Sequence, residues 1–198
     1  MRNLNLSDPR ILEESLVVSA SAGSGKTFTL TVLVTADLGQ GSIRPYEILA
    51  TTFSEAAAAD LRERLLRPLD LLAALDAPAW GALLPLLRTP DIGEIEALLK
   101  GLPLPERLGK SCQEVAQAAA LWQAAPWAES PTHAQAFWRR TRREAELLQV
   151  STIHSLALGL LRQGEGAPEA ILDAAHPALL RLLRQAVRER LALPEDHP

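Results

Sequence analysis

A glycine-rich turn near the N-terminus restricts the possible folds of this chain more than any other feature. The stretch SASAGSGKTFTL, residues 19–30, follows the apolar run LVVS at 16–19. A short β-branched run before a glycine turn is typical of a buried strand. The apolar spacing after Lys26 predicts a helix to about Leu38, ended by Gly39 and Gly41.

The turn fits a phosphate-binding loop, whose pattern is G-x-x-x-x-G-K-[ST] between a strand and a helix. Small residues let successive backbone N–H groups face a phosphate, and the helix start adds the positive end of its dipole. We expect Lys26 to reach the β- and γ-phosphates of a nucleoside triphosphate and Thr27 to coordinate Mg²⁺. The expected binding residues are Ala20, Ser21, Ala22, Gly23, Ser24, Gly25, Lys26 and Thr27, with Ala20 where the pattern has its first glycine.

A second strand and helix follow directly. EILATTF, Glu47 to Phe53, predicts a strand, and Ser54 is expected to cap a helix that Pro68 ends. The order strand, helix, strand, helix predicts an α/β fold with the parallel sheet core of a P-loop NTPase, in RecA-like form and incomplete.

The rest of the chain is predicted to contain a long helical segment followed by one more strand and two helices. From about 68 to 146, prolines separate short Leu/Ala-rich segments, which predicts a helical insertion in one domain spanning 1–198. LLQVSTI, Leu147 to Ile153, predicts a strand that returns to the sheet. A helix is expected from His154 or Ser155 to Gln163, and a last helix with a break at Pro177 follows.

Composition excludes some classes of protein. The 198 residues suit one domain, and the net charge of −4 gives no overall basic surface for nucleic acid. Cys112 is the only cysteine, which excludes an intrachain disulfide. No apolar run approaches the roughly 20 residues of a membrane span. Acidic residues at 8, 13 and 14 interrupt any signal peptide, so we expect no membrane association and a cytoplasmic location.

Three separate stretches narrow the class of NTPase. ASAGSGKTFTL, TTFSEAAAADLRERL and VSTIHSLALGLLR occur in this order. Together they resemble motifs I, Ia and Ic of superfamily I (UvrD/Rep-like) DNA helicases, specifically the N-terminal motor domain of the RecB and AddA helicase-nuclease branch. The resemblance implies an ATP-dependent DNA helicase of double-strand break repair and recombination, with ATP and Mg²⁺ as cofactors.

The resemblance also implies a single-stranded DNA site. Its residues would be Thr52, Phe53 and Ser54 after the second strand, and Thr152, His154 and Ser155 after the third. Hydroxyls and helix N-terminal amides suit contacts with phosphate oxygens that ignore base sequence. Phe53 is either a stacking face for a base or a core aromatic, and His154 is either a nucleic-acid contact or a structural hydrogen-bonding residue.

Other charged residues and the remaining histidines give less specific indications of function. The basic run FWRRTRRE at 137–144 is either a phosphate-neutralising surface or a solvated helix face, and we favour the second. Glu55 and Ala56 stand where many relatives of the resembled family have Asn and Lys, so one phosphate contact is missing. His133, His176 and His197 have no spacing that would assemble a metal site.

The stretches that are missing shape the functional hypothesis. The resembled family needs an acidic Walker B strand and arginines from a second motor domain for hydrolysis, and neither is present. We therefore expect this chain to be inactive alone and to work with the remaining helicase domains or a nuclease partner subunit. Two alternatives stay open: a stand-alone P-loop phosphotransferase, and a non-enzymatic interaction module with a vestigial P-loop.

Overall fold

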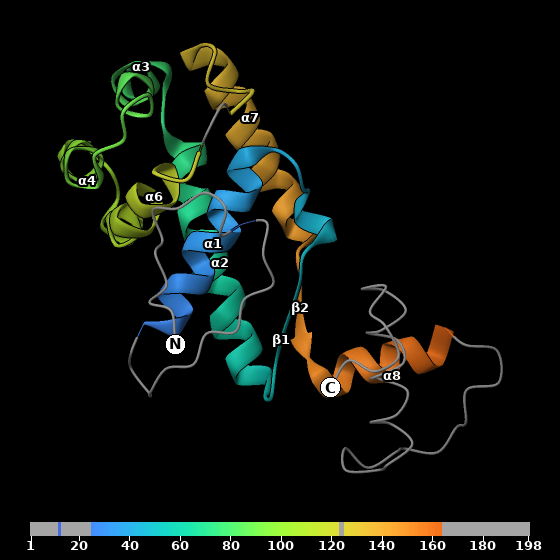
Figure 1. Ribbon diagram of the computed structural model, residues 1–198. Coiled ribbons are helices and arrows are strands. Elements are labelled where there is room, and N and C mark those ends of the chain that lie inside the picture. The colour runs from blue at the N-terminus through green and yellow to red at the C-terminus, as the bar shows by residue number, and fades with distance from the viewer. Residues whose placement is uncertain (1–11, 13–24, 123–124, 164–198) are drawn as a thin grey trace. The chain divides into compact units, whose positions relative to one another are not determined.

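The computed structural model describes residue 12, residues 25–122 and residues 125–163 (Figure 1). The chain forms two compact units. The larger unit comprises Met1–Leu49 and Ala59–Gln149, and the smaller unit comprises Ala50–Ala58 and Val150–Pro198. The predicted strand at 16–19 and the predicted helix after Gln163 lie outside the described residues.

Helices dominate the described part of the chain. The regular elements are α1 (Lys26–Gln40), the 3-10 helix η2 (Pro45–Glu47), β1 (Leu49–Thr52), α2 (Glu55–Ala74), α3 (Ala77–Leu86), α4 (Ile92–Gly101), α5 (Glu106–Gly109), α6 (Cys112–Ala119), α7 (Pro131–Glu144), the 3-10 helix η3 (Ala145–Leu147), β2 (Gln149–Thr152) and α8 (Ile153–Gln163). Every regular element described between β1 and β2 is helical. That this segment is an insertion in a larger domain stays a prediction.

Among the described residues no single helix is long and apolar enough to span a membrane. Helices α2 and α3 taken together have the length and composition of a span, but the pair is bent by 107°.

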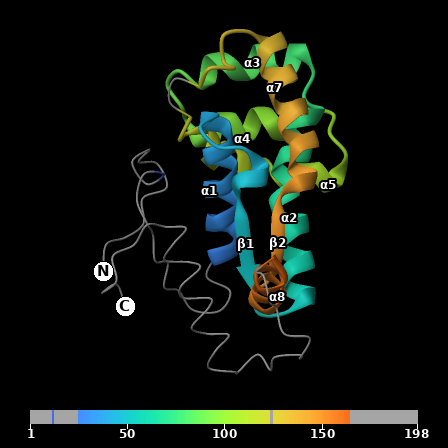
Figure 2. The same ribbon diagram turned by 90° about the vertical axis from the view of Figure 1, so that its right-hand side faces the viewer.

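The two strands pair side by side and run in the same direction (Figure 2). The backbone N–H of Gln149 donates to the carbonyl of Ile48 at 3.3 Å where the two strands begin. Each strand is four residues long and shorter than predicted at both ends, because Glu47 belongs to η2, Leu147 belongs to η3, Phe53 follows β1 and Ile153 begins α8. The predicted α/β class with parallel strand pairing is confirmed.

Helix α1 shows one correct and one wrong expectation about glycine. Gly41 ends the helix at φ 74°, a conformation that favours glycine, and its N–H donates to the Leu38 carbonyl. Gly39 instead lies buried inside the helix, so its prediction as a helix end is wrong. A Cβ at position 39 would lie 2.0 Å from Nε1 of Trp122, so close packing explains this glycine.

Helix α2 continues past Pro68, contrary to the prediction that this proline ends it. An interior proline loses one helical hydrogen bond and its ring crowds the preceding turn. Here the apolar face continues on both sides of the proline, since Leu65, Leu69 and Leu72 are all at most 1% exposed. Burial of that face outweighs the local penalty, as tertiary packing often does.

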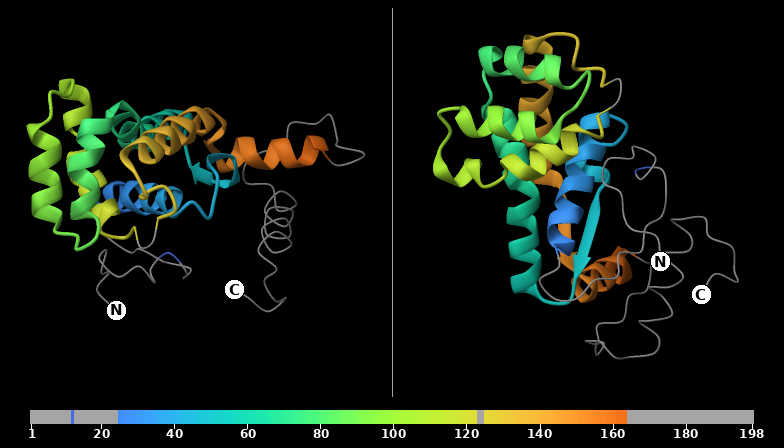
Figure 3. Two further views of the ribbon diagram at one scale, coloured as in Figure 1. Left: turned by 90° about the horizontal axis from the view of Figure 1, so that it is seen from above. Right: turned by 60° about the vertical axis from the view of Figure 1, so that its left-hand side comes forward.

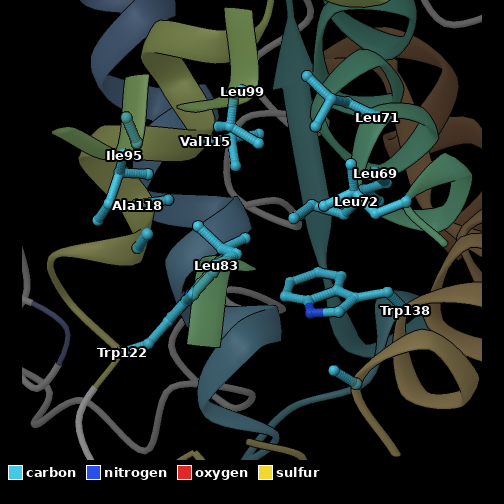
Figure 4. Packing of buried hydrophobic residues seen from close by; sticks show 14 of the residues in the cluster. Leu69, Leu71, Leu72, Leu83, Ile95, Leu99, Val115, Ala118, Trp122 and Trp138 are labelled. Atoms are coloured by element: carbon cyan, nitrogen blue, oxygen red, sulfur yellow. The ribbon is translucent and has the colours of Figure 1, made fainter. Parts of the chain in front are cut away.

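The core of the larger unit lies where its helices meet. Helix α6 packs on both α1 and α4, and α3 packs on α7 (Figure 3). Leucines of α2 and α3 and the ring of Trp138 fill the space between them (Figure 4). All four tryptophans of the chain are buried here, with ring centroids 5.2–5.4 Å apart in neighbouring pairs.

Candidate functional site

The described end of the predicted phosphate loop lies in the larger unit, where α1 begins. Ala20, Ser21, Ala22, Gly23 and Ser24 lie outside the described residues. Gly25 precedes the helix at φ 85°, ψ 11°, and its carbonyl accepts the first helical hydrogen bond, from the N–H of Thr29 at 2.9 Å. Lys26 is exposed and Thr27 is half-buried in the first turn.

The donor set at this helix start fits an anionic ligand. Because the first helical bond comes from Thr29, the N–H groups of Lys26, Thr27 and Phe28 precede the hydrogen-bond ladder of α1. Among the described residues no side chain caps this helix, and its first turn contains no acidic residue. Backbone N–H groups, a lysine and a threonine hydroxyl together are the groups that hold a phosphate chain and its Mg²⁺.

Replacing Gly25 with alanine tests whether the loop geometry depends on glycine. A Cβ at position 25 would meet nothing within 4 Å, so the cost is the positive φ alone. We expect Gly25→Ala to lower the free energy of unfolding by about 1 kcal/mol, measured by urea denaturation. Gly101→Ala is the control, because position 101 is also open but has no positive φ. Equal losses for both variants would contradict the conformational explanation.

The smaller unit brings together the ends of β1 and β2, which carry the six residues predicted to contact nucleic acid. Phe53 follows β1 and is 92% exposed, so it is not a core aromatic. Ser54 caps α2, since its Oγ accepts the N–H of Ala57 at 3.2 Å, as predicted. Thr52 is half-buried at the end of β1. An aromatic ring with this exposure can offer a face to a base.

A carboxylate and two hydroxyls form a hydrogen-bonded cluster in the same unit. Oγ1 of Thr152 accepts the N–H of Ser155 at 3.0 Å, which caps the start of α8. The Ser155 hydroxyl donates to Oε1 of Glu55 at 2.9 Å. The Thr152 hydroxyl lies 2.9 Å from Oγ of Ser155 and 3.3 Å from the same Glu55 oxygen. Glu55, which sequence reasoning treated only as a missing contact, is therefore a member of the site.

His154 lies beside this cluster in sequence but does not join it in the described hydrogen bonds. Its side chain is half-buried, and its Nδ1 atom is buried without a hydrogen-bond partner among the described residues. A structural histidine normally has its buried ring nitrogen satisfied. The observation gives no support to a structural role through Nδ1, and contact with nucleic acid stays a prediction.

Arg62 is a second residue whose role sequence reasoning missed. From α2 it donates to the Leu148 carbonyl at 2.5 Å and to the Glu146 carbonyl at 2.8 Å. These carbonyls precede β2, so Arg62 holds the start of this strand. The arginine in the Leu-Arg-x-Arg part of the second motif was the available signal, and its role here is structural.

Two arginines of the basic run on α7 are engaged by other residues of the protein. Arg142 pairs with Asp70 and with Glu146, and its hydrogen bond lowers the pKa of the Glu146 carboxyl. Arg140 lies 3.7 Å from a Glu144 oxygen and stands over the Phe137 ring. The favoured interpretation of the run as a solvated helix face stays a prediction, because Arg140 is exposed but Arg142 is partly buried against Asp70 of α2.

A pocket of about 220 Å³ also occurs in the larger unit. Residues of α2 and α5 and the adjoining Lys110 line it: Glu63, Leu66, Arg67, Asp70, Arg107, Leu108 and Lys110. None of the predicted site residues is among them. The pocket is therefore separate from the candidate sites described above.

Two comparisons with known proteins, one with family models and one with curated relatives, find helicase-related proteins. The family model of the UvrD/REP helicase N-terminal domain matches residues 5–177. The RecB subunit of the RecBCD enzyme of Mycobacterium tuberculosis is 44% identical over 79 residues, or 38% of this chain and 7% of the relative. The ATP-dependent DNA helicase PcrA of Staphylococcus aureus is 42% identical over 53 residues, or 27% of this chain and 7% of the relative.

A third relative, RecB of Mycolicibacterium smegmatis, is 44% identical over 64 residues, or 32% of this chain and 6% of the relative. The chain thus matches a small fraction of the length of these curated relatives. No solved structure matches the chain.

Proposed function

Since the chain belongs to the UvrD/REP helicase N-terminal domain family, we propose that it binds ATP with Mg²⁺ and single-stranded DNA within an ATP-dependent DNA helicase. The proposed nucleotide site is the segment Ala20 to Thr27, and the proposed DNA site is the pair of strand ends in the smaller unit. Bound ATP supplies the free energy of hydrolysis for movement along DNA. Lys26 neutralises phosphate charge and Thr27 offers its hydroxyl to Mg²⁺.

The exposure of Phe53 carries the DNA part of this proposal. An aromatic ring that is 92% exposed in a chain with only three phenylalanines is unusual, because apolar rings normally stabilise a core. Base stacking on aromatic rings tolerates every sequence, as a motor moving along DNA requires. Ser54 and Ser155, which are both exposed, place hydroxyls at these strand ends that suit contacts with phosphate oxygens.

The finer assignment is to the RecB and AddA type of helicase, in double-strand break repair and recombination. Support comes from the Thr-Phe-Ser-Glu-Ala-Ala and Ser-Thr-Ile-His-Ser stretches and from the likeness to two mycobacterial RecB subunits. With this assignment we also propose that the protein is cytoplasmic and works with a nuclease partner subunit. The phosphotransferase alternative is less favoured. Such an enzyme needs arginines that cover the phosphates, and Arg140 and Arg142 of the basic run at 137–144 are engaged by neighbouring carboxylates.

Replacing Phe53 with alanine tests the DNA site. We expect Phe53→Ala to weaken binding of a fluorescein-labelled oligothymidine by about 1–3 kcal/mol, roughly 5- to 150-fold, in a fluorescence anisotropy titration. Tyr46→Ala is the matched control, because Tyr46 is an aromatic residue that is 51% exposed on η2. Equal affinities for the wild type, Phe53→Ala and Tyr46→Ala would argue against the DNA site.

A further inference from the structure

The protons of the cluster formed by Glu55, Thr152 and Ser155 are already committed within the protein. Each hydroxyl carries one proton and can donate one hydrogen bond. The Ser155 proton goes to the Glu55 carboxylate at 2.9 Å. The Thr152 proton has two acceptors within reach, Oγ of Ser155 at 2.9 Å and the same carboxylate oxygen at 3.3 Å. Both acceptors belong to the cluster.

This arrangement conflicts with phosphate binding at the same hydroxyls. A phosphate oxygen accepts hydrogen bonds, so it needs the protons that Glu55 and Ser155 now receive. The carboxylate is also negatively charged and lies within 3.3 Å of both hydroxyl oxygens. Two anions at such a distance repel each other unless a cation or solvent separates them.

We propose that Glu55 occupies the position of a DNA phosphate oxygen and so sets a low affinity for single-stranded DNA. The inference rests on the proposed function in taking DNA as the ligand. Glu55 and Ser155 are both exposed, so the Glu55 side chain can turn to solvent when a phosphate arrives and release the Ser155 hydroxyl, while Thr152 stays buried at 5% exposure. Glu55 is then an affinity-determining residue, and its neutralisation strengthens DNA binding where loss of a purely structural contact would weaken it.

Glu55→Gln in the full 198-residue chain tests this inference. Glutamine keeps the shape and one acceptor oxygen but removes the charge. We expect about fivefold tighter binding of a fluorescein-labelled oligothymidine at low salt, and a smaller gain at roughly 300 mM salt, where the charge is screened. Glu94→Gln is the control, because Glu94 is also exposed in the first turn of a helix, α4, and gives the same change in net charge.

The outcomes separate this inference from the proposed function. Unchanged or weaker binding by Glu55→Gln, while Phe53→Ala still loses affinity, overturns the role of Glu55 and leaves the DNA site standing. An equal gain with Glu94→Gln overturns it too, because the effect is then one of net charge. Absence of binding by the wild type and Glu55→Gln alike overturns both proposals. If the glutamine variant does not fold, Glu55→Ala removes the same charge, and tighter binding supports the inference while unchanged or weaker binding overturns it.

Discussion

Replacing Trp138 with alanine is expected to lower the free energy of unfolding by about 3–5 kcal/mol, a larger loss of stability than we expect from Gly25→Ala. Trp138 on α7 is 0% exposed, and its ring packs 5.2 Å from the centroid of Trp122 and 5.4 Å from that of Trp127. Alanine would leave a cavity among rigid rings that cannot close around it. The measurement is the urea midpoint and slope, followed by tryptophan fluorescence and circular dichroism.

Trp138→Phe is the matched variant, and it should lose much less stability than Trp138→Ala. Phenylalanine keeps an aromatic ring in the cluster and removes the indole N–H, which is buried without a partner among the described residues. The lost volume and the relieved N–H act in opposite directions, so we expect a change below about 1.5 kcal/mol. A free energy of unfolding for Trp138→Ala within about 1 kcal/mol of the wild type would show that the cluster is not the core of the larger unit.

This pair of variants also separates two interpretations of the basic run around Trp138. An aromatic residue beside four arginines is typical of a nucleic-acid surface as well as of an amphipathic helix. The structure buries Trp138 and engages Arg142 with Asp70, so the helix uses its aromatic face for packing. We therefore expect Trp138 variants to change stability and not the salt dependence of DNA binding.

The sequence predicted the two described strands and the helices that follow Gly25, Ser54 and Thr152 better than it predicted their ends, and it missed both 3-10 helices. The periodicity around Lys26, Ser54 and Ser155 gave helices because local spacing determines the buried face of a helix. Pro68 and Gly39 were misinterpreted because both were judged from local backbone preference alone. Helix α2 continues through Pro68 because the leucines on both sides of it are buried in tertiary contacts, and Gly39 is needed because it packs against Trp122, which is distant in sequence.

In the candidate site, too, residues with a local sequence signal could be predicted and residues that depend on tertiary contacts could not. Phe53, Thr152 and Ser155 could be predicted as candidates because short motifs specify a strand, a turn and a helix start in consecutive residues. Glu55 bonds to Ser155 across a separation of 100 residues, and Arg62 bonds to the Leu148 carbonyl across 86. Pairings of this kind depend on how β1 and β2 align in the sheet, which no single motif encodes.

Arg62 and Glu55 act on the two ends of the same strand. Arg62 holds the carbonyls where the chain enters β2, and Glu55 bonds the hydroxyls where the chain leaves it. Each of these bonds lies within one unit and joins a residue of α2 to the segment that contains β2.

Replacing Lys26 with alanine is expected to abolish most of the affinity for ATP. The ammonium group stands at the first residue of α1, directly after the positive-φ glycine, where a phosphate chain would meet the helix start. Removal of a charged partner from an ion-paired phosphate costs roughly 2–5 kcal/mol, or about a 30-fold or greater rise in Kd. Titration with a fluorescent ATP analogue in the presence of Mg²⁺ measures it directly.

Lys100→Ala is the control for Lys26→Ala, since it removes the same charge from the surface of α4, where Lys100 pairs with Glu96 at 2.6 Å. A surface pair of this kind contributes little, so its loss should leave ATP affinity unchanged. If Lys26→Ala binds the analogue as tightly as Lys100→Ala does, the loop is vestigial and the chain is an interaction module. If only Lys26→Ala loses affinity, the phosphate loop is functional, because a general change in net charge would affect both variants equally.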